Sequence, residues 1–264
     1  MDVLTLAPQD SAFIRDSMTI RQAIVLAAGK GTRMKSDLPK VLFEVCGRPM
    51  VSFVIDTLKS AGVERIIVVV GYRADLVRET LSEYDDLLFV EQTEQLGTGH
   101  AVMVCRDELA AREGSVVIVT GDSPLLQQDS VGSLLAEAES SGAACVIGTL
   151  HKDNPQGLGR IVRDSDGAFA AIVEEKDATP DQRAISEVNM STYVFDRREL
   201  LRALDQLTND NRQQEYYITD CPGILKGEGK EVRALPVLQP CEALSVNTVA
   251  ELTIVEDELR KLGN

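Results

Sequence analysis

Three short runs of β-branched and apolar residues restrict this chain to a small set of folds. The runs are Ile24–Leu26, Ile66–Val70 and Val116–Val119, and their unbroken apolar character is typical of strands that are buried on both faces. Met50–Ala61, between the first two runs, has apolar residues at helical spacing, and so has Ala74–Leu81, which follows the second run. Strands that alternate with helices in this way predict right-handed crossovers and a parallel sheet.

The alternation continues to Leu150 and then changes. Gly157–Ile161 and Ala170–Glu175 are short strand-like segments joined by a turn at Asp166–Gly167, which indicates a small antiparallel portion. We therefore expect an α/β fold with a Rossmann-like, mostly parallel central sheet and helices on both faces. The other expected strands are Leu87–Val90, Ala143–Leu150, Val188–Phe195, Val232–Val237 and Ala243–Val246, and the other expected helices begin near Ala101 or span Val131–Ser140, Arg197–Leu207, Tyr216–Leu225 and Val249–Leu262.

The segment Ala23–Lys40 has the composition of a phosphate-binding loop. Gly29 and Gly31 lack a Cβ, so the backbone can turn sharply and bring its N–H groups against an anion. Arg33 adds a planar cation and Lys40 a movable point charge. The spacing fits neither a dinucleotide fingerprint nor a Walker loop, because glycines are missing at positions that those motifs require. An ordinary strand-to-loop turn is the alternative for this segment taken by itself.

The charge balance limits the classes of partner. Lys and Arg total 27 against 42 Asp and Glu, which gives a formal net charge of −15, and Trp is absent; nothing favours a nucleic-acid groove. An acidic chain would bind phosphates through a locally basic pocket or a metal. The five cysteines are scattered without a Cys-x-x-Cys pair, which favours a reduced, cytoplasmic setting and argues against zinc. Since long apolar runs are missing, we expect neither a signal peptide nor a membrane span.

Asp122 stands just past the end of the Ser115–Thr120 strand. Open α/β sheets bind ligands beyond the carboxyl ends of their strands, and Mg²⁺ favours one or two protein oxygens together with substrate phosphates. Asp122 is therefore a candidate Mg²⁺ ligand. Its alternative role is to cap the turn before Pro124.

Gln95–His100 places two glycines and a hydroxyl at the start of an expected helix. Such a segment can hold an anion or let a planar ring approach the backbone, and a plain helix start capped by Thr98 is the alternative. His100 and His151 are the only histidines. Because no Ser or Cys nucleophile motif accompanies either of them, we expect no catalytic triad.

Two polar features lie in the second half of the chain. Glu174–Lys176 would ordinarily be a solvated charge run. Asn189 lies within the apolar strand Val188–Phe195, where a polar amide usually has a hydrogen-bond partner.

These motifs together resemble the sugar nucleotidyltransferase family, and most closely the uridyltransferase domain of bacterial N-acetylglucosamine-1-phosphate uridyltransferases. The first motif is typical of sugar nucleotidyltransferases in general, whereas Gln95–His100 and Val173–Ala178 point to the uridyltransferase branch. The matching segments keep the family's order and are Leu26–Met34 with Pro39–Lys40, Glu94–His100, Gly121–Asp122, Gly157–Ile161, Ile172–Ala178 and Glu215–Asp220.

The resemblance implies roles for the matching positions. It implies that Asp122 and Asn247 hold Mg²⁺ and that Arg33 and Lys40 are the catalytic cations. It further implies substrate contacts in three groups: uracil and ribose at Leu26, Ala27, Ala28 and Gly29, the base edge at Gln92, Gly97 and Thr98, and the sugar at Gly159, Glu174 and Asn189 with Thr120 and Gly121 nearby.

The implied reaction converts UTP and N-acetylglucosamine 1-phosphate into UDP-N-acetylglucosamine and pyrophosphate by in-line attack of the sugar phosphate. Catalysis would rest on alignment and charge stabilisation, so we expect Arg33→Ala, Lys40→Ala and Asp122→Ala each to reduce turnover about a hundredfold or more. The alternatives are the same chemistry on another sugar 1-phosphate or with dTTP or CTP, and a non-catalytic nucleotide-sugar-binding regulatory subunit. The oligomeric state is left open.

Departures from the family pattern bear on these expectations. Met190–Ser191 follow Asn189 where relatives have Thr-Gly, and Thr120 stands where some relatives have Tyr. Bifunctional members continue into a left-handed β-helix acetyltransferase domain, which we do not expect in this chain. The expected organisation is an N-terminal extension over residues 1–17 and a nucleotidyltransferase domain over 18–264, divided into a nucleotide-binding part (18–150), a sugar-binding part (151–247) and a C-terminal helix (248–264).

Overall fold

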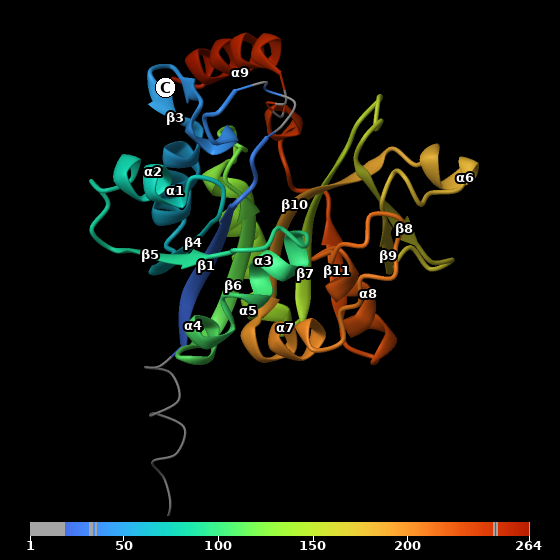
Figure 1. Ribbon diagram of the computed structural model, residues 1–264. Helices are drawn as coiled ribbons and strands as arrows, with labels where there is room; N and C mark the ends of the chain where they lie inside the picture. Colours follow the sequence, from blue (N-terminus) through green and yellow to red (C-terminus); the bar gives the residue numbers. More distant parts are fainter. Residues whose placement is uncertain (1–18, 32–33, 35, 245, 247, 264) are drawn as a thin grey trace, which may run out of the picture.

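The computed structural model describes residues 19–31, 34, 36–244, 246 and 248–263, and Figure 1 shows a central sheet with helices on either side. Within these residues the main sheet has nine strands. Seven of them follow the order β11-β7-β10-β6-β1-β4-β5, and the antiparallel pair β8–β9 branches from β10. The strands are β1 Thr19–Ala27, β4 Arg65–Val70, β5 Leu87–Glu91, β6 Glu113–Thr120, β7 Cys145–His151, β8 Gly159–Arg163, β9 Phe169–Val173, β10 Glu187–Asp196 and β11 Val232–Leu235.

The strands of this sheet run mostly in one direction. β1 pairs in parallel with β4 and β6, β4 with β5, and β11 with β7. β10 is antiparallel to both β6 and β7, so β7 runs the same way as β6. All seven strands except β10 therefore place their carboxyl ends at one edge. The predicted α/β fold with a mostly parallel sheet is confirmed.

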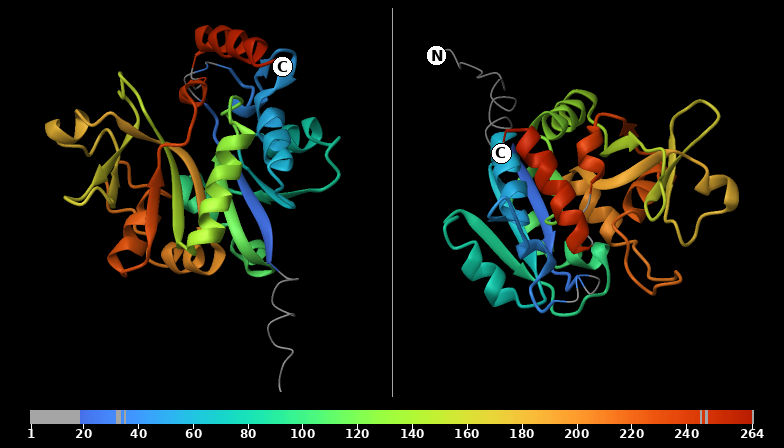
Figure 2. Two further views of the ribbon diagram at one scale, coloured as in Figure 1. Left: turned by 180° about the vertical axis from the view of Figure 1, so that it is seen from behind. Right: turned by 90° about the horizontal axis from the view of Figure 1, so that it is seen from above.

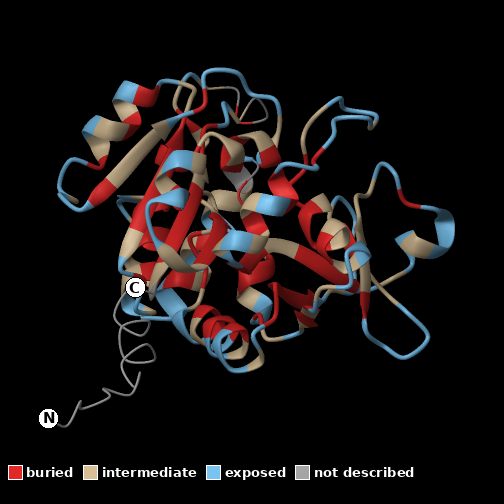
Figure 3. Cartoon of the chain, turned by 90° about the horizontal axis from the view of Figure 1, so that it is seen from below, coloured by how far each residue is buried: buried red, intermediate tan, exposed pale blue. Residues whose placement is uncertain are grey.

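Helices cover both faces of the sheet, as two opposite views show (Figures 1 and 2). Val25 and Val117 pack against one set of helices, α1, α2 and α5, whereas their strand neighbours Ile24 and Ile118 pack against α3, α4, α7 and α8. Figure 3 shows the buried residues along the strands and the inner sides of the helices. The helices are α1 Met50–Ser60, α2 Ala74–Thr80, α3 Thr98–Met103, α4 Arg106–Ala110, α5 Gln128–Ser141, α6 Pro180–Arg183, α7 Arg197–Leu204, α8 Asp220–Gly227 and α9 Val249–Lys261, with 3-10 helices η2 Lys40–Leu42 and η3 Pro240–Ala243.

One expected strand is wrong. The sequence predicts a strand at Ala243–Val246, but Ala243 is the last residue of η3, which begins at Pro240, and the described residues Leu244 and Val246 belong to no strand. A capping box joins Gln239 and Glu242 at the start of η3. Proline fixes φ near the value that a helix start needs, so the short helix η3 takes up the first residue of the segment where the strand was expected.

Other elements differ from expectation in their extent. The helix expected from Tyr216 begins only at Asp220, which places Pro222 in the first turn, where its missing N–H costs little. The short helices α4 and α6 were not expected, nor was the hairpin of β2 (Glu44–Val45) and β3 (Arg48–Pro49). The extension over residues 1–17 lies outside the described residues.

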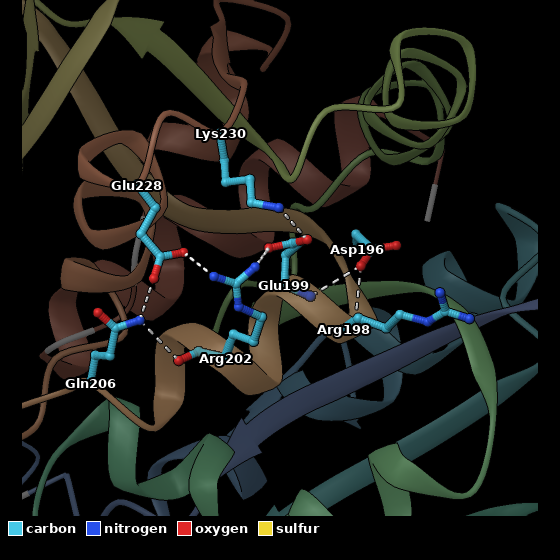
Figure 4. Close-up of polar contacts among 7 residues, drawn as sticks. All are labelled: Asp196, Arg198, Glu199, Arg202, Gln206, Glu228 and Lys230. Atoms are coloured by element: carbon cyan, nitrogen blue, oxygen red, sulfur yellow. Dashed lines mark hydrogen bonds and ion pairs between the residues drawn. The ribbon is translucent and has the colours of Figure 1, made fainter.

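A polar network joins α7 to the segment after α8 (Figure 4). The Arg202 guanidinium lies 3.3 Å from Glu199 and 2.9 Å from Glu228. Lys230 pairs with Glu199 at 2.8 Å, and Gln206 donates to Glu228 at 2.7 Å. Ion pairs this close to solvent contribute roughly 0–1 kcal/mol each, so the apolar core beneath α7 and α8 supplies most of the stability here.

A third, smaller apolar cluster lies between α9 and the loops that follow β1. Val255 and Leu259 of α9 share this cluster with Met34. Glu256 of the same helix accepts a hydrogen bond from the backbone N–H of Cys46, in the turn between β2 and β3, at 2.9 Å. Figure 1 shows α9 beside β3, at the carboxyl edge of the sheet.

Candidate functional site

A cavity of about 310 Å³ opens at the carboxyl ends of β1, β5 and β6. The expected nucleotide contacts Leu26, Ala28, Gly29, Gln92, Gly97 and Thr98 line it, together with Lys40, Thr120 and Asp122. Ala27 and Gly121 adjoin these residues in the chain. Gly31 of the expected phosphate-binding loop and Gln95 of the Gln95–His100 segment also line it, and so do three residues that were given no role, Val41, Ala101 and Glu215.

An ion pair lies in the wall of this cavity. Lys40 Nζ is 2.5 Å from Asp122 Oδ2, and the two side chains are 15% and 25% exposed. Lys40 reaches this position because Gly31, at φ +67°, leaves room for it: a Cβ on Gly31 would lie 2.6 Å from Lys40 Cβ. The expected cation Arg33 lies outside the described residues. A cation and a carboxylate thus face the space where phosphates were expected.

The donor set fits one divalent cation shared with a phosphate ligand. Asp122 supplies a partly exposed carboxylate that faces the cavity. Its expected partner Asn247 lies outside the described residues. In the described part of the chain, no three His, Cys, Asp or Glu side chains form a complete metal cluster. Mg²⁺ needs no such cluster, because it takes most of its ligands from water and substrate phosphates.

The amide of Gln92 is held in the opposite wall. Its Nε2 lies 3.0 Å from Gly97 O and 3.0 Å from His100 Nδ1. Gln92 is 3% exposed, and Gln95 Nε2 donates to its backbone carbonyl at 3.1 Å. The side chain therefore presents one fixed orientation to the cavity.

The start of α3 is tied to a segment more than a hundred residues further along the chain. Gly97 has φ +107°, and a Cβ there would lie 2.5 Å from Tyr216 O. The Gly99 N–H donates to the same carbonyl at 2.7 Å. The Thr98 hydroxyl accepts from the Ile218 N–H at 3.2 Å and makes no cap of its own helix. The alternative in which Thr98 is a plain helix cap is therefore wrong.

The expected sugar contacts come together on β8, on β10 and just past the end of β9. Gly159 pairs with Asn189 in the sheet, and a Cβ on Gly159 would lie 3.4 Å from Glu174 Oε1. Burial raises the pKa of Glu174, and a hydrogen bond with Thr219 partly offsets this increase. Asn189 Nδ2 donates to the Tyr193 hydroxyl at 2.7 Å, so the expected partner for this strand amide is confirmed.

Glu174 and Glu175 do not form a solvated charge run. Glu175 pairs at 2.7 Å with Arg160, whose side chain is 2% exposed. Glu174 lines a separate cavity of about 220 Å³ with Asp177 and Asp220. Burial, and then the charge of Asp177, raise the pKa of Asp220. The run is thus part of the structure around the second cavity.

The fold and the main cavity define an α/β protein with a candidate ligand site at the carboxyl ends of its parallel strands. The family model of the MobA-like NTP transferase domain matches residues 23–220. The chain therefore belongs to that family. The nucleotidyltransferase family that the motifs predict is thereby confirmed.

Proteins of known sequence give the same result. The chain is 46% identical over 242 residues to the bifunctional protein GlmU of Clostridium acetobutylicum, a match that covers 92% of this chain and 53% of that protein. The chain is 44% identical over 242 residues to GlmU of Exiguobacterium sibiricum, and this match covers 92% of this chain and 54% of that protein. It is 46% identical over 247 residues to GlmU of Limosilactobacillus fermentum, and this match covers 94% of this chain and 54% of that protein. The chain thus spans about half the length of these relatives. Among the described residues, no helix is long and apolar enough to cross a membrane.

Proposed function

We propose that this chain transfers UMP from UTP to N-acetylglucosamine 1-phosphate, with Mg²⁺ bound, and forms UDP-N-acetylglucosamine and pyrophosphate. The observation that carries the proposal is the Lys40–Asp122 pair at 2.5 Å in the cavity that Gln92 also lines. Together they offer a cation for phosphates, a carboxylate for a metal and an amide for a base. An acidic chain can bind two polyanions in this way, because the required positive charge is local.

Gln92 supports a uracil base. Gly97 O can only accept, so Nε2 must face it, and the carbonyl Oε1 remains for the ligand. Uracil presents an N–H donor at N3, whereas cytosine presents an acceptor there. A buried acceptor rejects a ligand that cannot donate to it, because the polar group would be left unpaired.

The proposed chemistry needs no protein nucleophile. The phosphate oxygen of the sugar attacks the α-phosphorus of UTP in line, the bond from that phosphorus to the bridging oxygen breaks, and pyrophosphate leaves with the electron pair. Lys40 would counter the negative charge of the phosphates, with Arg33 as its expected partner. When bound at Asp122 and Asn247, Mg²⁺ would neutralise phosphate oxygens and help to hold them in line.

Gly159, Glu174 and Asn189 are the proposed sugar contacts. Their mutual proximity supports this proposal, because Gly159 pairs with Asn189 and Glu174 lies against both β8 and the second cavity. The proposed division of the domain has residues 18–150 binding the nucleotide, 151–247 the sugar and 248–264 forming the C-terminal helix. The proposed setting is cytoplasmic, and the proposed partners are small molecules and not nucleic acid.

Release of pyrophosphate tests the proposal. The protein is incubated with Mg²⁺, each of UTP, dTTP and CTP, and a panel of sugar 1-phosphates. We expect release with UTP and N-acetylglucosamine 1-phosphate, and loss of release when EDTA removes the metal. Release with another pair would identify a different substrate. If no pair releases pyrophosphate although UDP-sugars bind tightly, the chain is a binding subunit and the proposal is wrong.

A further inference from the structure

We propose that His100 is a positioning residue for base selection: it holds the Gln92 amide so that Oε1 faces the nucleobase. The inference rests on the proposed use of a uridine nucleotide. It concerns a side chain that is not among the lining residues of the cavity and that acts through Gln92.

The hydrogen bonds around Gln92 determine which atom of His100 accepts. Gly97 O, at 3.0 Å, takes one N–H of Gln92 Nε2. The second N–H of the same group points to His100 Nδ1, also at 3.0 Å. His100 Nδ1 must therefore be the unprotonated nitrogen of a neutral ring, with its proton on Nε2. Both donors of the Gln92 amide are used, and none of the described residues donates to Oε1.

The backbone around His100 fixes the place of its ring. His100 is the third residue of α3, and the Gly99 N–H beside it is bonded to Tyr216 O at 2.7 Å. The Tyr216 ring lies 6.5 Å from the His100 ring, at an interplanar angle of 33°. The imidazole is thus held between the start of α3 and the segment at Tyr216, and it can hold Gln92 in turn.

Loss of the His100 acceptor would leave Gln92 with one of its two partners. The amide could then rotate, or turn over to present Nε2 to the base, and the distinction between a donor and an acceptor at N3 would weaken. A hydrogen bond in such a place contributes up to about 1.5 kcal/mol, which corresponds to about a tenfold change in a binding constant.

The test compares two variants of His100, one without and one with a hydrogen-bond acceptor for Gln92. His100→Phe keeps a planar ring but has no acceptor. His100→Asn keeps a polar atom on Cγ, where Nδ1 is attached, and can accept from Gln92. His151→Asn is the matched control, because His151 is exposed and its Nδ1 lies 3.1 Å from Ser186 Oγ, a residue outside the cavity lining. Each protein is titrated with UTP and with CTP by calorimetry, with Mg²⁺ and without a sugar phosphate.

We expect the wild type and His151→Asn to bind UTP more tightly than CTP by the same ratio. His100→Phe should lower this ratio about tenfold, and His100→Asn should stay within about threefold of wild type. Melting temperatures confirm that each variant is folded. An unchanged ratio in His100→Phe overturns the inference, and so does an equal loss in folded His100→Asn and His100→Phe.

The binding readout separates this inference from the proposed reaction. A wild-type protein that selects UTP over CTP, and loses this selection in His100→Phe alone, supports the role of His100 even if no sugar 1-phosphate yields pyrophosphate. In that case only the proposed transfer reaction fails. Equal wild-type affinity for UTP and CTP overturns the inference, because there is then no base selection for His100 to position.

Discussion

Lys40 and Asp122 carry opposite charges and have different proposed partners. Lys40 would bind a phosphate of the substrate, and Asp122 would bind a metal. Replacing either by Ala removes a preorganised charge partner, and we expect turnover to fall about a hundredfold or more. Initial rates of pyrophosphate release measure the effect. Lys30→Ala is the matched control, because Lys30 belongs to the same loop but is exposed, is not among the residues that line the cavity, and lies over the Tyr72 ring at 5.0 Å. Near-normal turnover in Asp122→Ala would remove this carboxylate from the metal site.

Ser191 adopts a backbone conformation that favours glycine. Its φ is +55°, in a register shift of β10 between Asn189 and Thr192. A residue with a Cβ pays about 1–2 kcal/mol of free energy to adopt the left-handed region. Glycine avoids this cost, but it lowers the free energy of unfolding by about 0.5–1 kcal/mol because the unfolded chain is more flexible. We expect Ser191→Gly to raise the free energy of unfolding by about 0.5 kcal/mol, as urea denaturation would measure.

The opposite substitution provides the control for Ser191. Valine is β-branched and tolerates a positive φ poorly, so Ser191→Val should lower the free energy of unfolding by more than about 1 kcal/mol. If Ser191→Gly and Ser191→Val shift stability in the same direction, backbone strain is not the controlling factor at this position.

At the scale of elements, the strands of the sheet were predictable because both faces are buried. Val116–Val119 is apolar throughout, and its alternate residues enter two separate cores. The same reasoning failed at Ala243–Val246, since a short apolar run fits a strand or a turn of helix equally well. There the carboxylate of Glu242 accepts from the Ser130 hydroxyl at 2.6 Å and from the Gln239 N–H at 2.6 Å. That buried network involves residues far apart in sequence, and no local pattern predicts it.

A partly buried ion pair joins β7, β8 and β10 in the proposed sugar-binding part. The Glu187 carboxylate accepts two hydrogen bonds of 2.7 Å from the Arg163 guanidinium and one of 2.6 Å from the Thr149 hydroxyl. Burial raises the pKa of Glu187, but the Arg163 and Thr149 hydrogen bonds outweigh it and hold the pKa below its usual value. Removing the carboxylate charge leaves the Arg163 charge with backbone carbonyls as its remaining partners, so we expect Glu187→Gln to cost about 2 kcal/mol at pH 7.

The pH dependence of the Glu187 pair has a definite sign. Because the folded state lowers this pKa, the pair stabilises the fold above the ordinary glutamate value of about 4.3. That stability is lost as the pH falls from this value through the lower folded pKa. Urea denaturation of wild type and Glu187→Gln should therefore converge over that window. Glu139→Gln is the control: Glu139 binds Arg21 through a similar fork but is 45% exposed, and the cost should be below about 1 kcal/mol. An equal cost at both sites would show that burial is not what matters.

At the scale of the whole molecule, the site was predictable where each residue belongs to a local motif. Gly29 and Asp122 closely follow the ends of β1 and β6, Lys40 belongs to the same loop motif as Gly29, and parallel strands bring their ends to one edge. Glu215 lines the same cavity but could not be inferred from spacing, because it arrives from a loop that is distant in sequence. His100 belongs to the Gln95–His100 motif, but its bond to Gln92 could not be predicted, since that bond depends on how α3 packs.

The helix α9 supports the phosphate loop from outside the sheet. Leu259 is 1% exposed and packs in the small cluster that contains Met34, whose N–H donates to Gly31 O at 2.9 Å. Leu259→Ala should therefore lower the free energy of unfolding by about 3 kcal/mol and raise the KM for UTP, because the loop loses its packing. Thermal denaturation and initial rates at varied UTP measure the two effects. Ile254→Ala, on the same helix but 53% exposed, should change neither. If Leu259→Ala is destabilised while the KM for UTP is unchanged, α9 stabilises the fold without holding the loop.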